Sequence, residues 1–169
     1  MDFHTQTEIA HDIDRIVKII NYGIFNSGNS DNPLRESAFI ELMICVRDLM
    51  GKAEKHAERI SFSDNVNLTK GVEDVSDAIS KIRNAVCHIG SPHREIGEST
   101  NRVSFASMSG KGVLMNMGDV TLESEYEDDI CFFYGDHRLY LKRHIIRAFE
   151  EAKKLLVPLF DDHMRRMYQ

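Results

Sequence analysis

The sequence predicts a mainly α-helical protein, an antiparallel four-helix bundle with a small antiparallel β insertion between the third and the last long helix. Three observations favour this class. Apolar residues recur at helical spacing in four segments, the period changes to alternation over about residues 101–135, and 169 residues suit a single domain, 1–169, with its own core. Because each amphipathic helix must bury one face, packing the helices together is the simplest arrangement.

The first two helices are predicted by their caps and apolar stripes. Thr5 can form a capping box with Glu8. The apolar positions that follow are Ile9, Ile13, Ile16, Val17, Ile20 and Ile24. After a loop at 26–31, Asn32 as N-cap and Pro33 at the first helical position begin the second helix. Apolar residues cover much of its circumference, so we expect it to lie between other helices.

The third and last helices have equally clear stripes. The third carries Val72, Val75, Ile79, Ile82, Val86 and Ile89, and Gly90 and Pro92 mark its end. The last is expected from about His137, with apolar positions at Leu141, Ile145, Ala148, Ala152, Leu155, Leu156 and Leu159, and Pro158 should kink or end it.

Four strands are expected between these helices. They are residues 103–108, 113–117, 120–125 and 130–134, with a glycine turn at 109–112. The acidic run at 123–129 is interpreted as a solvated hairpin edge that discourages strand pairing.

Composition narrows the possible functions. The net charge of -6 argues against a protein whose whole surface binds nucleic acid, although a local basic site remains compatible with it. The three cysteines, Cys45, Cys87 and Cys131, are far apart and odd in number, which indicates a reducing compartment. The first 20 residues lack the pattern of a secretory signal, and no apolar run is long enough for a membrane helix. We therefore expect a soluble, cytoplasmic protein.

One segment, residues 81–90, combines side chains that can perform chemistry. Asn84 and His88 are spaced one helical turn apart, and Arg83 has a side chain long enough to reach the same ligand. His88 falls in the expected last turn, where unpaired carbonyls favour the imidazolium. An imidazole that moves protons beside a guanidinium that holds phosphate is suited to phosphodiester cleavage.

The pattern of Arg83, Asn84, three further residues and His88 resembles the R-x4-6-H motif of HEPN domains (higher eukaryotes and prokaryotes nucleotide-binding). The resemblance implies a metal-independent endoribonuclease without cofactors, of the kind found in toxin–antitoxin, abortive-infection and RNA-processing systems. It implies a homodimer in which the two motifs meet in one cleft. Arg83 and His88 would be the catalytic pair and Asn84 would orient them, with the ribose 2′-hydroxyl as nucleophile. Gly90 occupies the place where some such toxins carry a tyrosine.

Other residues are candidates for RNA contacts. Beside the motif these are Lys81, His93 and Arg94; on the second helix, Arg47 and Asp48 can face the motif or form a simple surface ion pair. Arg83 and His88 could themselves be an exposed arginine and a capping histidine. A nucleophilic or metal-binding role for Cys87 is disfavoured because other ligands lie at no recognised spacing.

Three functions therefore compete. The leading one is a homodimeric ribonuclease, a toxin or phage-defence effector that acts on RNA. The second is a module that binds RNA or a nucleotide without cutting it. The third is a protein-interaction module, the partner of an antitoxin or a nucleotidyltransferase, with the β insertion as its docking edge.

Overall fold

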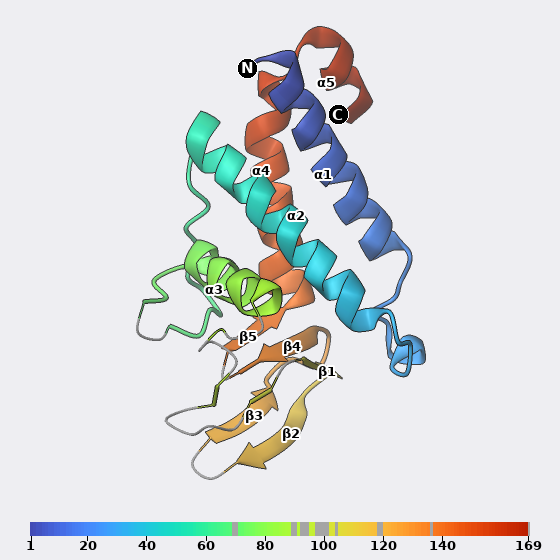
Figure 1. The fold of residues 1–169 in the computed structure, drawn as a ribbon, viewed down its shortest axis with the longest axis vertical. Helices are drawn as coiled ribbons and strands as arrows, with labels where there is room; N and C mark the ends of the chain where they lie inside the picture. Colours follow the sequence, from blue (N-terminus) through green and yellow to red (C-terminus); the bar gives the residue numbers. More distant parts are fainter. Residues whose placement is uncertain are drawn as a thin grey trace.

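The structure, a computed structural model, describes residues 1–68, 71–88, 91, 95–96, 102–103, 105–117, 120–135 and 137–168. The α-helices in these residues are α1 (Phe3–Asn21), α2 (Arg35–His56), α3 (Val75–Cys87), α4 (Arg147–Leu156) and α5 (Asp162–Tyr168). The strands are β1 (Ala106–Ser109), β2 (Gly112–Met117), β3 (Val120–Ser124), β4 (Ile130–Tyr134) and β5 (His137–Tyr140). In Figure 1 the helices occupy the upper part of the molecule and the strands the lower part.

The prediction of a four-helix bundle with a small insertion is wrong. The described residues form five α-helices and two antiparallel sheets, one with the strand order β1-β4-β5 and the other made of β2 and β3. Alternate residues of β4 point to opposite sides: Phe132 and Tyr134 belong to the helical core, whereas Cys131 and Phe133 pack with the β2–β3 hairpin. Because β4 is buried on both faces, the sheet is a layer of the core and not an appendage of a bundle.

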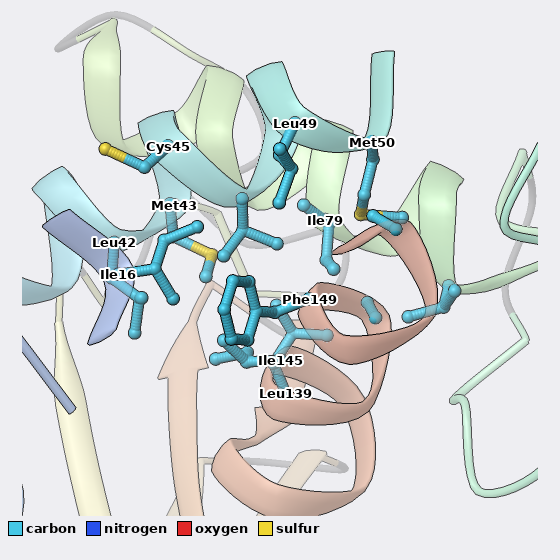
Figure 2. Packing of buried hydrophobic residues seen from close by; sticks show 14 of the residues in the cluster. Ile16, Leu42, Met43, Cys45, Leu49, Met50, Ile79, Leu139, Ile145 and Phe149 are labelled. Carbon is cyan, nitrogen blue, oxygen red and sulfur yellow. The ribbon is translucent and has the colours of Figure 1, made fainter. Parts of the chain in front are cut away.

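Helix α2 lies at the centre of the helical layer. It packs against α1, α3 and α4, as the run of buried residues along it predicts. Figure 2 shows Leu42, Met43 and Leu49 of α2 among side chains from the neighbouring elements, including Ile79 of α3 and Phe149 of α4. The expectation that the second helix sits between other helices is confirmed.

Helix ends differ from the sequence predictions. Asp2, and not Thr5, caps α1, because the Asp2 carboxylate accepts a hydrogen bond from the Thr5 backbone N–H at 2.8 Å. Helix α2 begins at Arg35, and the Asn32 side chain instead accepts from the Leu34 N–H at 2.9 Å. Helix α3 ends at Cys87, before the expected stop.

The start of the last helix is also corrected. Residues His137–Tyr140, expected to be helical, form β5 and pair with β4, and a π-helical stretch, Leu141–Ile146, precedes α4. The buried carboxylate of Asp129 fixes this junction. It accepts from the backbone N–H groups of Lys142 and Arg143, at 2.9 and 3.1 Å, and from the Arg143 guanidinium at 3.0 Å. At Asp129 the acidic run is therefore not a solvated edge.

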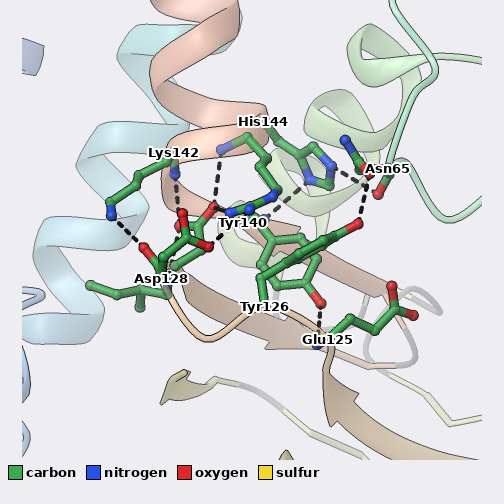
Figure 3. A network of polar contacts seen from close by, with 10 residues as sticks. Asn65, Glu125, Tyr126, Asp128, Tyr140, Lys142 and His144 are labelled. Carbon is green, nitrogen blue, oxygen red and sulfur yellow. Dashed lines mark hydrogen bonds and ion pairs between the residues drawn. The ribbon is translucent and has the colours of Figure 1, made fainter. Parts of the chain in front are cut away.

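A polar network around His144 connects the 61–68 segment to the sheet (Figure 3). The Tyr140 backbone N–H donates to His144 Nδ1 at 3.1 Å, so Nε2 carries the proton and donates to the Asn65 carbonyl at 2.9 Å. The Tyr126 hydroxyl donates to the Asn65 side-chain oxygen at 2.6 Å. Burial lowers the pKa of His144 to about 4, so the imidazole is neutral at neutral pH.

Among the described residues, none of the helices has both the length and the apolar character needed to cross a membrane.

The buried imidazole predicts a specific pH dependence of stability. In the unfolded chain His144 titrates near its ordinary pKa of 6.5, and in the folded protein near 4. The contribution of neutral His144 to the free energy of unfolding is therefore complete above pH 6.5. It is lost as the pH falls toward 4, by up to about 3 kcal/mol. Burial raises the pKa of Asp12 to about 6, so protonation of Asp12 stabilises the folded protein as the pH falls through the same range. The effect of His144 is therefore isolated by comparing the wild type with a variant at that position.

We expect the stability advantage of the wild type over His144→Gln, measured by urea unfolding, to shrink steadily between pH 7 and pH 4. His163→Gln, at an exposed position of α5, should track the wild type throughout. An advantage independent of pH would show that His144 is not held neutral.

Candidate functional site

A cavity of about 340 Å³ lies between α2 and α3. We call it the α2–α3 cavity. Each helix contributes three residues at the spacing i, i+3, i+4, which puts them on one face of the helix. The lining residues are Ile44, Arg47 and Asp48 from α2, and Ser80, Arg83 and Asn84 from α3. Four of the residues that the sequence singled out, two on each helix, are therefore brought together.

Arg47 reaches the cavity along the face of α2. A Cβ atom built on Gly51 would lie 2.8 Å from Arg47 Nη1, closer than two such atoms can pack. Glycine inside a helix costs about 1 kcal/mol relative to alanine. The absence of a side chain at Gly51 thus gives the guanidinium its place, one turn along the helix from its own Cα.

Arg83 is half-buried, and its guanidinium forms a hydrogen bond with the next residue in the sequence, Asn84. Its Nη1 donates to the Asn84 side-chain oxygen at 3.2 Å. Arg83 and Asn84 are therefore in contact with each other within the cavity lining. Among the described residues, neither Arg83 nor Arg47 forms an ion pair with a carboxylate.

Asp48, the carboxylate among the described lining residues, forms its ion pair with a lysine outside the cavity lining. Asp48 binds Lys52 one turn along α2, and Lys52 also contacts Asp12 of α1 at 3.0 Å. Burial opposes ionisation of Asp48, but the hydrogen bond and charge of Lys52, together with the charge of Arg47, outweigh it and lower its pKa. Lys52 also lies 3.6 Å from a Glu8 oxygen, so three carboxylates share its charge. Among the described residues, neither arginine of the cavity forms an ion pair with this cluster.

His88 follows Asn84 by four residues in the sequence, but it does not line the cavity. It is the exposed C-cap of α3 in an extended conformation, and its backbone N–H donates to the Asn84 carbonyl at 3.1 Å. The expected position in the last helical turn, above Asn84, is wrong because the helix ends at Cys87. His88 is therefore at the end of the helix that carries Arg83 and Asn84, and it is not part of the cavity lining.

Of the remaining candidates, the structure describes only Lys81. Lys81 extends toward Gly71, where a Cβ atom would meet its Nζ at 3.2 Å, and it is not part of the cavity lining. His93 and Arg94 lie outside the described residues.

Sequence reasoning missed Ile44 and Ser80. Each stands three residues before an arginine that was chosen, so the same helical spacing could have identified both. Ile44 adds an apolar surface and Ser80 a hydroxyl to the cavity. Within the described ranges, no group of three or more His, Cys, Asp or Glu side chains is arranged to hold a metal ion.

Comparison with known proteins adds no relative: no family model, no curated protein and no solved structure matches this chain. The chemistry of the site therefore has to be argued from its own residues. Two arginines that line one cavity and have no ion pair among the described residues, beside an amide and a hydroxyl, have the donors needed to hold a phosphate group.

The position of Gly51 gives a test of this arrangement that separates stability from binding. Gly51→Ala should raise the free energy of unfolding by up to about 1 kcal/mol, because alanine favours the helix. It should also weaken binding of inorganic phosphate several-fold, because the added methyl group displaces the Arg47 guanidinium. Urea unfolding and an NMR titration with phosphate measure the two effects.

The matched control is Gly28→Ala, since a Cβ atom there would meet nothing within 4 Å. It should leave phosphate binding unchanged. Equal affinities of Gly51→Ala and wild type would show that Arg47 does not take part.

Proposed function

We propose that this chain is a ribonuclease that cleaves RNA without a metal ion, by attack of the ribose 2′-hydroxyl on the adjacent phosphate. The observation that supports it is the α2–α3 cavity, which Arg47 and Arg83 both line with no ion pair to a carboxylate among the described residues. A phosphodiester is the common biological anion that such a pair of planar donors recognises. The exposed imidazole at the end of α3 supplies a group that can move a proton.

Each residue has a definite role in this proposal. Arg47 and Arg83 hold the nonbridging oxygens of the scissile phosphate and stabilise the charge that develops on them. Asn84 keeps the Arg83 guanidinium in position through the 3.2 Å hydrogen bond. His88 accepts the proton of the 2′-hydroxyl as its oxygen bonds to phosphorus.

The reaction also needs an acid for the leaving group. In the homodimer that we propose, the protonated His88 of the second subunit gives its proton to the departing 5′-oxygen. The products are a 2′,3′-cyclic phosphate and a free 5′-hydroxyl, so atoms and charges balance without a further reactant. DNA lacks the nucleophile and should not be cut.

We place this activity in the cytoplasm. The three cysteines are free thiols, and Cys87 is exposed at the end of α3. An exposed free thiol is typical of a reducing compartment.

A second candidate function follows from the position of His88. Because the imidazole does not line the cavity, the same two arginines could bind RNA or a nucleotide in a module that does not cut it. Binding and cleavage are therefore separated in the test.

The test uses a labelled RNA oligonucleotide and the DNA of the same sequence, incubated with the purified protein in EDTA. We expect cleavage of RNA alone, with 2′,3′-cyclic phosphate ends. His88→Ala should reduce the rate by about 100-fold or more, the usual contribution of a general base or acid. Arg83→Ala should reduce both rate and affinity, since it holds the substrate phosphate.

His163→Ala is the matched control, an exposed histidine on α5, and should keep the wild-type rate. Circular dichroism verifies that each variant folds. Tight RNA binding without products would favour the binding module, and cleavage that persists in His88→Ala would refute the assignment of that residue.

A further inference from the structure

A second cavity, of about 360 Å³, lies between the end of α4 and α5, and we call it the α4–α5 cavity. In Figure 1 these elements stand at the end of the molecule opposite the β2–β3 hairpin. None of its lining residues belongs to the α2–α3 cavity. It lies near the lower end of the size range of small-molecule sites, roughly 300 to 1,000 Å³.

The polar part of the lining is mainly cationic. Lys153, Lys154 and Arg165 contribute three positive charges against one negative charge from Glu150. This excess stands out on a chain with a net charge of -6. Local charge, and not the average, governs which ligand a cavity attracts.

In the part of the chain that the structure describes, the two lysines differ from several arginines in having no ion pair. Among the described residues, neither Lys153 nor Lys154 forms an ion pair, whereas Arg59, Arg143 and Arg147 each bind two or more carboxylates. A bound anion would therefore not have to displace a carboxylate partner from either lysine.

Arg165 is held in place on the α5 side of the cavity. Its Nη2 donates to the Phe160 carbonyl at 2.8 Å and lies 3.4 Å from an Asp162 oxygen. Its buried Nε has no acceptor among the described residues. The guanidinium is thus fixed in position and keeps hydrogen-bonding capacity that the folded chain does not use.

The rest of the lining is apolar and includes a ring. Val157 and Pro158 form one part, and Tyr168 forms another. The Tyr168 ring packs edge-on against Phe160, with ring centroids 5.9 Å apart, and its hydroxyl donates to the Ala10 carbonyl. With the hydroxyl engaged on α1, the ring offers an aromatic surface that is already fixed.

We propose that the α4–α5 cavity binds a nucleoside monophosphate, with the phosphate at Lys153, Lys154 and Arg165 and the base against Pro158 and Tyr168. The charge excess selects a multiply charged anion, and the apolar wall selects an anion that carries a flat ring. This site is separate from the cleavage proposed at the α2–α3 cavity and does not depend on it.

The test is calorimetric titration of the whole protein with AMP, adenosine and inorganic phosphate. We expect AMP to bind with a dissociation constant below about 1 mM and each of the two fragments at least about tenfold more weakly. The double variant Lys153→Gln/Lys154→Gln should weaken AMP binding by about tenfold or more, because two charge-assisted contacts are lost. Tyr168→Phe should bind as the wild type does.

The matched control removes two exposed lysines from other elements, Lys55→Gln/Lys111→Gln, and should leave AMP binding within about twofold of wild type. Arg83→Ala should likewise bind AMP normally, which separates this site from the α2–α3 cavity. Absence of AMP binding, or equal loss in both double variants, would overturn the proposal. Binding of phosphate as tight as that of AMP would overturn the role given to the base.

Discussion

The packing of one face of α2 against three other helices is the constraint on which the structure depends. This helix packs against α1, α3 and α4 at once, and its buried residues include Leu42, Val46 and Leu49. The opposite face of α2 carries exposed and half-buried residues, and Arg47 and Asp48 are among them. Since Ser80, Arg83 and Asn84 lie on one face of α3, packing the two helices together places residues of both around one cavity. The core thus determines the site.

The helical part of the fold was largely predictable, because α1, α2 and α3 are defined by local periodicity. The error came from the β region and from the start of the last helix. Residues His137–Tyr140 join a helical stripe in the sequence, yet pairing with β4 decides their conformation. Asp129 then fixes the next turn through backbone groups of Lys142 and Arg143, thirteen and fourteen residues away. A contact of that kind leaves no periodic signal in the sequence.

The candidate site was predictable to a similar extent. Arg83 and Asn84 were selected from the motif, and both line the cavity. For Arg47 and Asp48 the sequence left two possibilities, facing the motif or forming a surface ion pair, and the structure shows both residues in the cavity lining and Asp48 paired with Lys52. The placement of His88 was wrong, because the end of α3 depends on backbone geometry that a helical wheel cannot represent. The role of Gly51 could not be predicted either. Gly51 matters because its missing side chain leaves space for the Arg47 guanidinium, and a sequence pattern does not show such a contact.

The central claim is that the α2–α3 cavity is where the RNA backbone binds. The most direct measurement is an NMR titration with a short RNA whose 2′-hydroxyls are methylated, so that it can bind without being cut. The account predicts that the largest shift changes fall on Ser80, Arg83, Asn84 and the Arg47 guanidinium. Changes confined to other surfaces, or none at saturating RNA, would contradict it.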